Sequence, residues 1–363
     1  MYKITRAQEI EDLIRGAAVL ATGGGGNPKE GLKLLEEALK IKGEISIIDV
    51  DEVREDWVAV TPYYVGTIAP LAKTKKPVKI TDSMTLAFRK MEKNLDKKIN
   101  AVVPGEIGGE NTPVAINIGA KMNLPILDGD LIGRAAPEIT QGILHIFDVP
   151  MYPSVLVSET GNILIVEKYA DIEDYEAIAR FVSILEGRFI AVVDTPLVRE
   201  NIKKVVVKNS VSKCIEIGRV IRESRKKGKN PVDAVVKAIN GWKIFEGVVK
   251  GYTWKDEGGF LVGEALLGGI NEWQGHTLKS WIKNEHIMAW RDNKPIVMPP
   301  DLMAFLLDNG EAVINSDLKK DIKVQVVATK APEIWRTPKG LELFGPKHFG
   351  FNLEYVPVEE LVK

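Results

Sequence analysis

Short apolar runs alternate with amphipathic segments along the first 130 residues, and this alternation restricts the fold more than any other feature of the chain. Apolar residues recur at helical spacing in four segments, residues 6–20, 30–41, 83–93 and 112–122. Three short apolar runs, residues 45–50, 57–60 and 101–103, lie between these segments, and a fourth, residues 126–127, follows the last of them. Helical spacing predicts helices, and the short runs predict buried strands. Because alternating strands and helices are typical of βαβ units, we expect an α/β domain with a mostly parallel sheet.

The pattern changes after Pro150, where strands begin to predominate. The triplet Glu159-Thr160-Gly161 separates two apolar runs, which predicts a hairpin. Further along, the spacing predicts helices over 172–185, 211–225 and 231–238, a strand over 189–193 and many short strands between 243 and 328. A chain of 363 residues exceeds the size at which one hydrophobic core usually stops growing. We therefore predict two domains: an α/β domain over 1–168, which carries the glycine-rich loop and acidic cluster described below, and a β-rich α+β domain over 169–363.

Charge and residue usage exclude several classes of protein. The 49 basic and 50 acidic side chains give a net charge of −1, which provides no global field for nucleic acid or an anionic membrane. No window approaches the roughly 18 apolar residues that a membrane-spanning helix needs, and residues 1–16 lack the apolar core of a signal peptide. The single cysteine, Cys214, rules out an intramolecular disulfide and fits a reducing compartment. We expect a cytoplasmic protein without nucleic-acid or membrane partners.

Four consecutive glycines form the most distinctive motif, Thr22-Gly-Gly-Gly-Gly-Asn27. Pro28 can begin a helix with Asn27 as its cap, so the glycines precede a helix N-terminus, where backbone N–H groups can approach the oxygen atoms of an anionic or carbonyl-bearing ligand. The predicted ligand-binding residues of this loop are Thr22, Gly23, Gly24, Gly25 and Gly26. The spacing matches neither the G-x-G-x-x-G fingerprint nor a Walker loop, so no nucleotide cofactor is predicted. A plain structural turn is the alternative.

A second motif, residues 103–111, follows a short apolar run and precedes a predicted helix. Glu106 should therefore lie at or just beyond the carboxyl end of a strand, which is the edge of an open α/β sheet where ligands bind. A carboxylate there could act as a general base or as a metal ligand. Asn111 is a second candidate for substrate binding, although a purely structural helix cap would explain it equally well.

A third motif repeats this arrangement around Asp128-Gly-Asp130, which follows the run at 126–127. Paired acidic residues at a strand end are common in metal sites, because hard cations take oxygen ligands, and an Asx turn is the structural alternative. A divalent metal held by Asp128, Asp130 and Glu106 is the corresponding hypothesis. Arg134 could hold a substrate carboxylate or carbonyl, or could neutralise the two aspartates. Glu138 completes the cluster as a candidate for substrate binding.

Taken together, these motifs resemble the DUF917 family, which is also described as S-methyl-thiohydantoin desulfurase-like. The resemblance covers nearly the whole chain. It is carried by residues 20–28, 106–111, 128–138, 258–260, 283–285 and 334–338. It implies an α/β N-terminal domain, a β-containing C-terminal domain and a link to hydantoinase and oxoprolinase-type proteins, which handle cyclic amides. The segment Tyr63–Thr67 and Glu110 depart from the family pattern. These departures affect what the resemblance implies about the identity of the substrate more than what it implies about the scaffold.

Two functions follow as hypotheses. The first is a hydrolase or lyase that acts on a small cyclic amide, such as a hydantoin, a thiohydantoin or an oxoproline-like ring. In that reaction the glycine loop would polarise a ring carbonyl, Glu106 or Asp130 would activate water directly or through the metal, and Arg134 would orient the substrate. The second is a non-catalytic binding subunit that partners a hydantoinase or oxoprolinase-type enzyme. In either case we expect a homo-oligomer.

Overall fold

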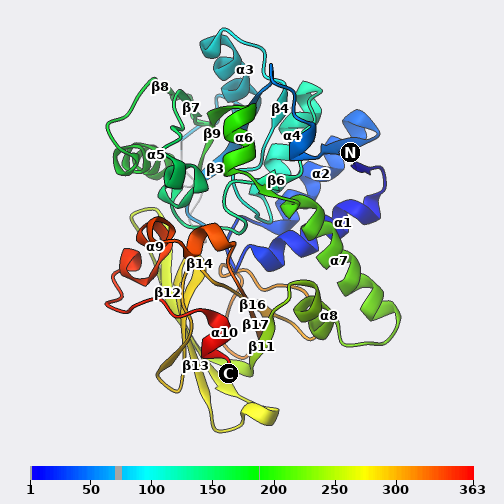
Figure 1. Cartoon of the computed structure of the whole chain (residues 1–363), viewed down its shortest axis with the longest axis vertical. Helices are drawn as coiled ribbons and strands as arrows, with labels where there is room; N and C mark the ends of the chain where they lie inside the picture. Colours follow the sequence, from blue (N-terminus) through cyan, green and yellow to red (C-terminus); the bar gives the residue numbers. More distant parts are fainter. Residues whose placement is uncertain (1, 70–75, 188) are drawn as a thin grey trace.

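The computed structural model describes residues 2–69, 76–187 and 189–363, which form two large sheets and the helices packed around them (Figure 1). A small two-stranded sheet pairs β6 (Gly129–Asp130) with β10 (Val207–Lys208). The first sheet has eight strands in the order β1-β2-β5-β4-β3-β9-β7-β8. Its strands are β1 (Tyr2–Ile4), β2 (Ile45–Ile48), β3 (Val58–Gly66), β4 (Ala101–Val102), β5 (Ile126–Leu127), β7 (Ser154–Val157), β8 (Ile163–Val166) and β9 (Phe189–Val198). Strands β2, β5, β4 and β3 are parallel, which confirms the predicted α/β class, and the other strands join them antiparallel.

Local residue chemistry explains where the helices of this half begin and end. The side chain of Asn27 accepts a hydrogen bond from the N–H of Lys29, and Pro28 is the first residue of α2, as the sequence predicts. Gly43, in the left-handed region at φ 70°, ends that helix. The helices of this half are α1 (Ala7–Leu20), α2 (Pro28–Lys42), α3 (Ser83–Leu95), α4 (Asn111–Met122), α5 (Ile172–Glu186) and α6 (Arg199–Val205).

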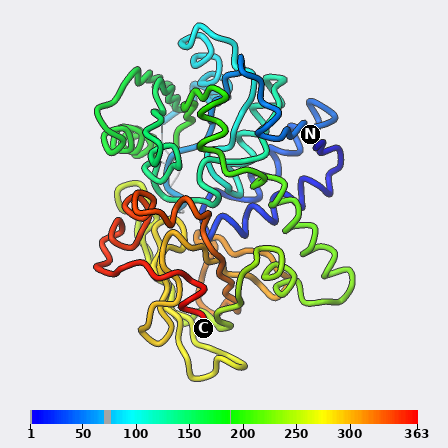
Figure 2. The backbone as a smooth tube through the Cα atoms, viewed as in Figure 1, coloured from blue at the N-terminus to red at the C-terminus, as the bar shows by residue number. Residues whose placement is uncertain are grey.

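Helix α7 (Ser210–Lys226) crosses α1 at very short range and leads through α8 (Pro231–Ala238) into the second half of the chain (Figure 2). Two glycines allow this crossing. A Cβ atom on Gly16 would lie 1.9 Å from the carbonyl oxygen of Cys214, and one on Gly218 would lie 1.8 Å from that of Asp12. Because the two backbones touch, neither position can carry a side chain without separating the helices.

The second sheet is entirely antiparallel and has seven strands in the order β15-β14-β13-β12-β11-β17-β16, with its own cluster of buried apolar side chains. Its strands are β11 (Trp242–Glu257), β12 (Phe260–Gly269), β13 (Thr277–Lys283), β14 (Glu285–Arg291), β15 (Lys294–Val297), β16 (Leu302–Leu306) and β17 (Lys323–Thr329). A β-rich second half is thus confirmed. The expectation of short strands throughout is wrong for β11, which continues for 16 residues. The residues Gly247 and Gly251 lie within β11 and mark no turn, and a bulge falls between Val249 and Gly251.

The two halves are interleaved in sequence. Strand β9, which follows the boundary predicted at 168, lies between β3 and β7 in the first sheet. Near the other end of the chain, Trp335 donates a hydrogen bond from Nε1 to the carbonyl of Ile132 at 2.7 Å, and α9 (Pro338–Phe344) follows at the junction of the halves (Figure 1). A short helix, α10 (Val358–Leu361), is the last element. The division into domains at 168 stays a prediction. Among the residues that the structure describes, no helix has the length and apolarity to cross a membrane.

Candidate functional site

A cavity of about 740 Å³ opens where the two halves meet, within the size range of small-molecule sites. Its walls come from the glycine loop, the end of β3, the loop between β4 and α4, residues 131–144 and the turn between β13 and β14. The ends of β3 and β4 are carboxyl ends of parallel strands, the edge at which α/β sheets bind ligands. Among the predicted site residues, Glu106, Asn111, Glu138 and part of the glycine loop line the cavity. The other predicted site residues, Thr22, Gly24, Asp128, Asp130 and Arg134, do not.

The glycine loop contributes fewer ligand donors than its sequence suggests. Gly23, Gly25 and Gly26 line the cavity, and all three have positive φ angles. However, the N–H of Gly24 donates to the carbonyl of Ala21 at 2.8 Å, and the N–H of Gly25 donates to the Oε1 of Glu285 at 3.1 Å. Within the described part of the chain, the N–H groups of Gly23 and Gly26 make no hydrogen bond. Two of the four predicted donors are therefore left to face a ligand.

Two hydrogen bonds fix the buried carboxyl group of Glu106. It follows β4, is 9% exposed, and receives hydrogen bonds from Nδ2 of Asn111 at 2.7 Å and from the N–H of Ala136 at 2.9 Å. Burial raises its pKa to about 7, against the lowering effect of these two donors. Asn111 is the first residue of α4, and the N-cap position belongs to Glu110, so the predicted cap role for Asn111 is wrong. The Asn111 side chain instead positions Glu106 and accepts from the N–H of Tyr64 at 3.0 Å.

A second carboxyl group, Glu285, reaches the same cavity from β14. Its side chain is 2% exposed, and its Oε2 has no hydrogen-bond partner among the described residues. Burial and the nearby charge of Glu106 raise its pKa well above the usual range. No local sequence motif predicts Glu285 as a site residue. Its only signal was its place in the family-like stretch 283–285, since nothing local to β14 predicts that it meets a loop 260 residues away.

The two aspartates have structural partners. The Oδ2 of Asp130 accepts from the N–H groups of Ile132 at 2.9 Å and Gly133 at 2.6 Å, which is the Asx turn considered as the alternative. The Oδ1 of Asp128 accepts from the N–H of Ser212 at 2.9 Å, in the first turn of α7. No group of three or more His, Cys, Asp or Glu side chains within the described residues could hold a metal ion. The donor set proposed for a metal is therefore not brought together, and the arrangement does not place Asp130 to activate water in the cavity.

Arg134 and Thr22 join the two halves. The guanidinium of Arg134 is fully buried, and all five of its N–H groups donate. The acceptors are the Oγ1 of Thr22 and the carbonyl oxygens of Ala135, His286, Pro300 and Asp301, at 2.9 to 3.3 Å. Burial lowers the pKa of Arg134 to about 10, so the group stays charged at neutral pH. With no donor left for a ligand, Arg134 does not orient a substrate directly.

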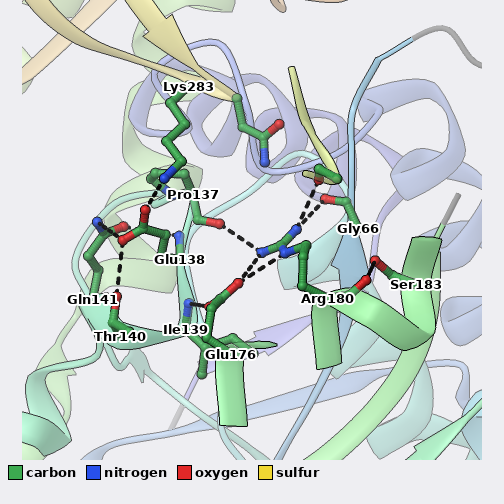
Figure 3. Close-up of polar contacts among 12 residues, drawn as sticks. Gly66, Pro137, Glu138, Ile139, Thr140, Gln141, Glu176, Arg180, Ser183 and Lys283 are labelled. Atoms are coloured by element: carbon green, nitrogen blue, oxygen red, sulfur yellow. Dashed lines mark hydrogen bonds and ion pairs between the residues drawn. The ribbon is translucent and has the colours of Figure 1, made fainter. Parts of the chain in front are cut away.

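One wall of the cavity is held by buried charges (Figure 3). Glu138 pairs with Lys283 and with the Nε2 of His348, which lies 2.5 Å from its Oε2. Burial alone would raise the pKa of Glu138, but these two partners lower it to about 2. Arg180, which no sequence motif marks, donates to the carbonyl oxygens of Pro137 and Gly66 and to Glu176. Glu138 lines the cavity, but its oxygens are already engaged by the protein.

Comparison with known proteins agrees with this architecture. Residues 8–168 match the model of the S-Me-THD-like N-terminal domain, and residues 170–358 match that of the S-Me-THD-like C-terminal domain. No curated protein matches the chain. The chain is similar in structure to a protein from Chromobacterium violaceum seen in a crystal structure, with a TM-score of 0.80 and 20% identity over 99% of this chain and 100% of the other. At that identity the likeness shows a shared fold.

Proposed function

The chain belongs to the S-Me-THD-like family, and from that membership we propose that it is a hydrolase of a small cyclic amide of the thiohydantoin type, with Glu106 as the base that activates water. The observation that carries this proposal is the position of Glu106. It is a buried carboxyl group on the wall of the cavity, beside the glycine loop, with a pKa of about 7. A base titrating near the working pH combines the correct protonation state with a useful affinity for the proton.

The proposed reaction uses groups already in place. Glu106, fixed by Asn111 and the N–H of Ala136, takes a proton from water as the water oxygen bonds to the ring carbon that carries sulfur. The free N–H groups of Gly23 and Gly26 would polarise the carbonyl of the ring, as an oxyanion hole does. The bond from that carbon to the exocyclic sulfur then breaks. No step is assigned to a metal, because the predicted ligands do not converge.

The size of the cavity supports a substrate larger than a bare ring. A volume of about 740 Å³ falls in the range that accommodates drug-sized ligands. Tyr64 and Phe189 both line the cavity, with ring centroids 4.7 Å apart, and offer an apolar surface. We therefore propose that the substrate ring carries an apolar or aromatic substituent that packs against this pair.

The test combines binding with turnover. S-alkyl-thiohydantoins, hydantoins and oxoproline are screened by thermal shift, because a ligand that binds only the native state raises the melting temperature. The ligands that bind are then assayed for thiol release and for ring opening, which separates cleavage at sulfur from cleavage of the ring amide. Glu106→Gln should bind the same ligands but turn them over about 10²- to 10⁴-fold more slowly.

Glu264→Gln, at an exposed glutamate of β12, is the matched control and should behave as the wild type. If the wild type binds one of these rings but does not turn it over, the hydrolase hypothesis is wrong. The alternative hypothesis, a non-catalytic subunit of a hydantoinase or oxoprolinase-type enzyme, then takes its place. If none of these rings raises the melting temperature, the proposed substrate class is incorrect.

A further inference from the structure

The carboxyl group of Glu285 packs against the backbone of the glycine loop. A Cβ atom on Gly24 would lie 1.8 Å from the Oε1 of Glu285, so the carboxyl group rests directly on the loop backbone. The residues on either side of it are also anchored. The Oδ1 of Asn284 accepts from the N–H of Leu261 at 2.9 Å, and the N–H of His286 donates to the carbonyl of Thr22 at 2.7 Å. The position of the Glu285 carboxyl group is therefore set by both halves of the molecule.

The two carboxyl groups of the cavity differ in the donors that they receive. Both oxygens of Glu106 accept hydrogen bonds, whereas Glu285 accepts one, from the N–H of Gly25. The Oε2 of Glu285 is without a donor in the described structure, and the five N–H groups of Arg134 are engaged elsewhere. An ionised carboxylate can only accept hydrogen bonds, and leaving it buried without donors is costly. The arrangement therefore favours the anion at Glu106 and the proton at Glu285.

We propose that Glu285 is the general acid of this site, and that its protonated carboxyl group gives its proton to the atom that leaves the ring. This inference rests on the proposed function. Both halves of the chain then contribute to the site, since Glu106 comes from the α/β half and Glu285 from the second sheet.

The protons and electrons of this reaction balance. Glu106 takes one proton from water, the water oxygen forms a bond to the ring carbon, and the electron pair of the C=N bond at that carbon moves to the ring nitrogen. The bond between that carbon and sulfur breaks with its electron pair going to sulfur, and the proton of Glu285 converts the thiolate into a free thiol. The remaining hydroxyl proton passes to the ring nitrogen as the carbonyl forms. Transfer of a proton from Glu106 to Glu285 then restores the starting state.

The first test measures the proton itself and does not depend on activity. The infrared difference spectrum between the wild type and Glu285→Gln at neutral pH should contain the C=O stretching band of a protonated carboxyl group. The same band should be present in the spectrum of Glu106→Gln and in that of the exposed control Glu264→Gln. Absence of the band from the wild-type minus Glu285→Gln difference would overturn the proposal, whether or not a substrate has been identified.

The second test uses the leaving group. For an S-alkyl substrate, Glu285→Gln should lower kcat by about 10²- to 10⁴-fold with little change in KM, because glutamine can still accept from Gly25 and donate to the ligand but cannot supply a proton. An arylthio group leaves the substrate as a stable thiolate and does not need a proton from the protein. On such a substrate the loss of kcat in Glu285→Gln should largely disappear, while the loss in Glu106→Gln persists. An equal loss on both substrates would overturn the acid role. A wild type inactive on both would count against the proposed function and would leave the infrared result to decide the protonation of Glu285.

Discussion

At Glu106, burial of the carboxyl group makes the stability of the fold depend on pH. The ionised form of its carboxyl group is disfavoured by burial, and its pKa in the folded protein, about 7, lies above the ordinary value of 4.5. A carboxyl group whose pKa is raised by folding binds its proton more tightly in the native state than in the unfolded one. The stability that it contributes is therefore present at low pH and is lost as the pH rises from about 4.5 to 7.

We therefore expect Glu106→Gln to be more stable than the wild type at pH 8, by on the order of 1 to 3 kcal/mol, because each pKa unit corresponds to about 1.4 kcal/mol. The difference should shrink towards pH 5, where the native wild type is also protonated. Urea denaturation at pH 5, 6, 7 and 8 measures it, and buried carboxyl groups that do not interact with Glu106 cancel in the comparison. Glu264→Gln should show no such trend. A gap that stays constant with pH would mean that Glu106 titrates normally.

Individual site residues could be predicted only where a strand end determines the position. Glu106 follows β4 and lies in the cavity as predicted, because the carboxyl end of a parallel strand faces that edge. Asp130 occupies a similar place in the sequence, yet its carboxylate turns inward to the N–H groups of Ile132 and Gly133. Whether such a side chain faces a ligand or its own backbone depends on contacts that the local pattern does not contain. Glu285 was missed because its partner, Gly25, is distant in the sequence.

At the scale of elements, the loop before α2 and the loop before α4 touch backbone to backbone. The N–H of Glu110 donates to the carbonyl of Gly25 at 2.9 Å. A Cβ atom on Gly108 would lie 2.5 Å from that same carbonyl oxygen. This contact sets the separation between the glycine loop and Glu106, so both walls of the cavity depend on it.

Gly108→Ala should force the two loops apart, destabilise the protein by about 1 to 3 kcal/mol and lower ligand affinity. Gly251→Ala is the matched control, because Gly251 lies within β11 and a Cβ atom there would meet nothing within 4 Å. Urea denaturation and ligand titration of both variants provide the measurement. If the two variants are equally stable, the contact between the loops is looser than the structure indicates.

Elements with strong local signals were predicted well, and their pairing was not. The helix that starts at Pro28 with Asn27 as its cap and the hairpin around Glu159-Thr160-Gly161 both form as expected, because their determinants lie within a few residues. The insertion of β9 between β3 and β7 depends on surfaces distant in the sequence. For that reason the spacing could predict a strand near 189 but not the sheet that it joins.

At the scale of the whole molecule, the cavity exists only because the halves are held together. Its lining includes Glu106 and the glycine loop from the first half and Glu285 and Asp317 from the second. Arg134 connects these halves through hydrogen bonds to three carbonyl oxygens of the second half, those of His286, Pro300 and Asp301. The predicted role of Arg134 in orienting a substrate is thus replaced by a role in joining the two halves of the site.

Arg134→Met keeps a long side chain but removes every donor, so these buried carbonyl oxygens lose a partner. We expect a loss of about 3 to 5 kcal/mol in the free energy of unfolding, the usual cost of breaking a buried charged network. Urea denaturation followed by circular dichroism measures it, with Arg219→Met, at an exposed position of α7, as the control. Because the same contacts align Glu106 with Glu285, the variant should also lose ligand binding at urea concentrations where its secondary structure persists. If binding and secondary structure are instead lost together in both variants, the halves are held together by their apolar contacts and not by Arg134.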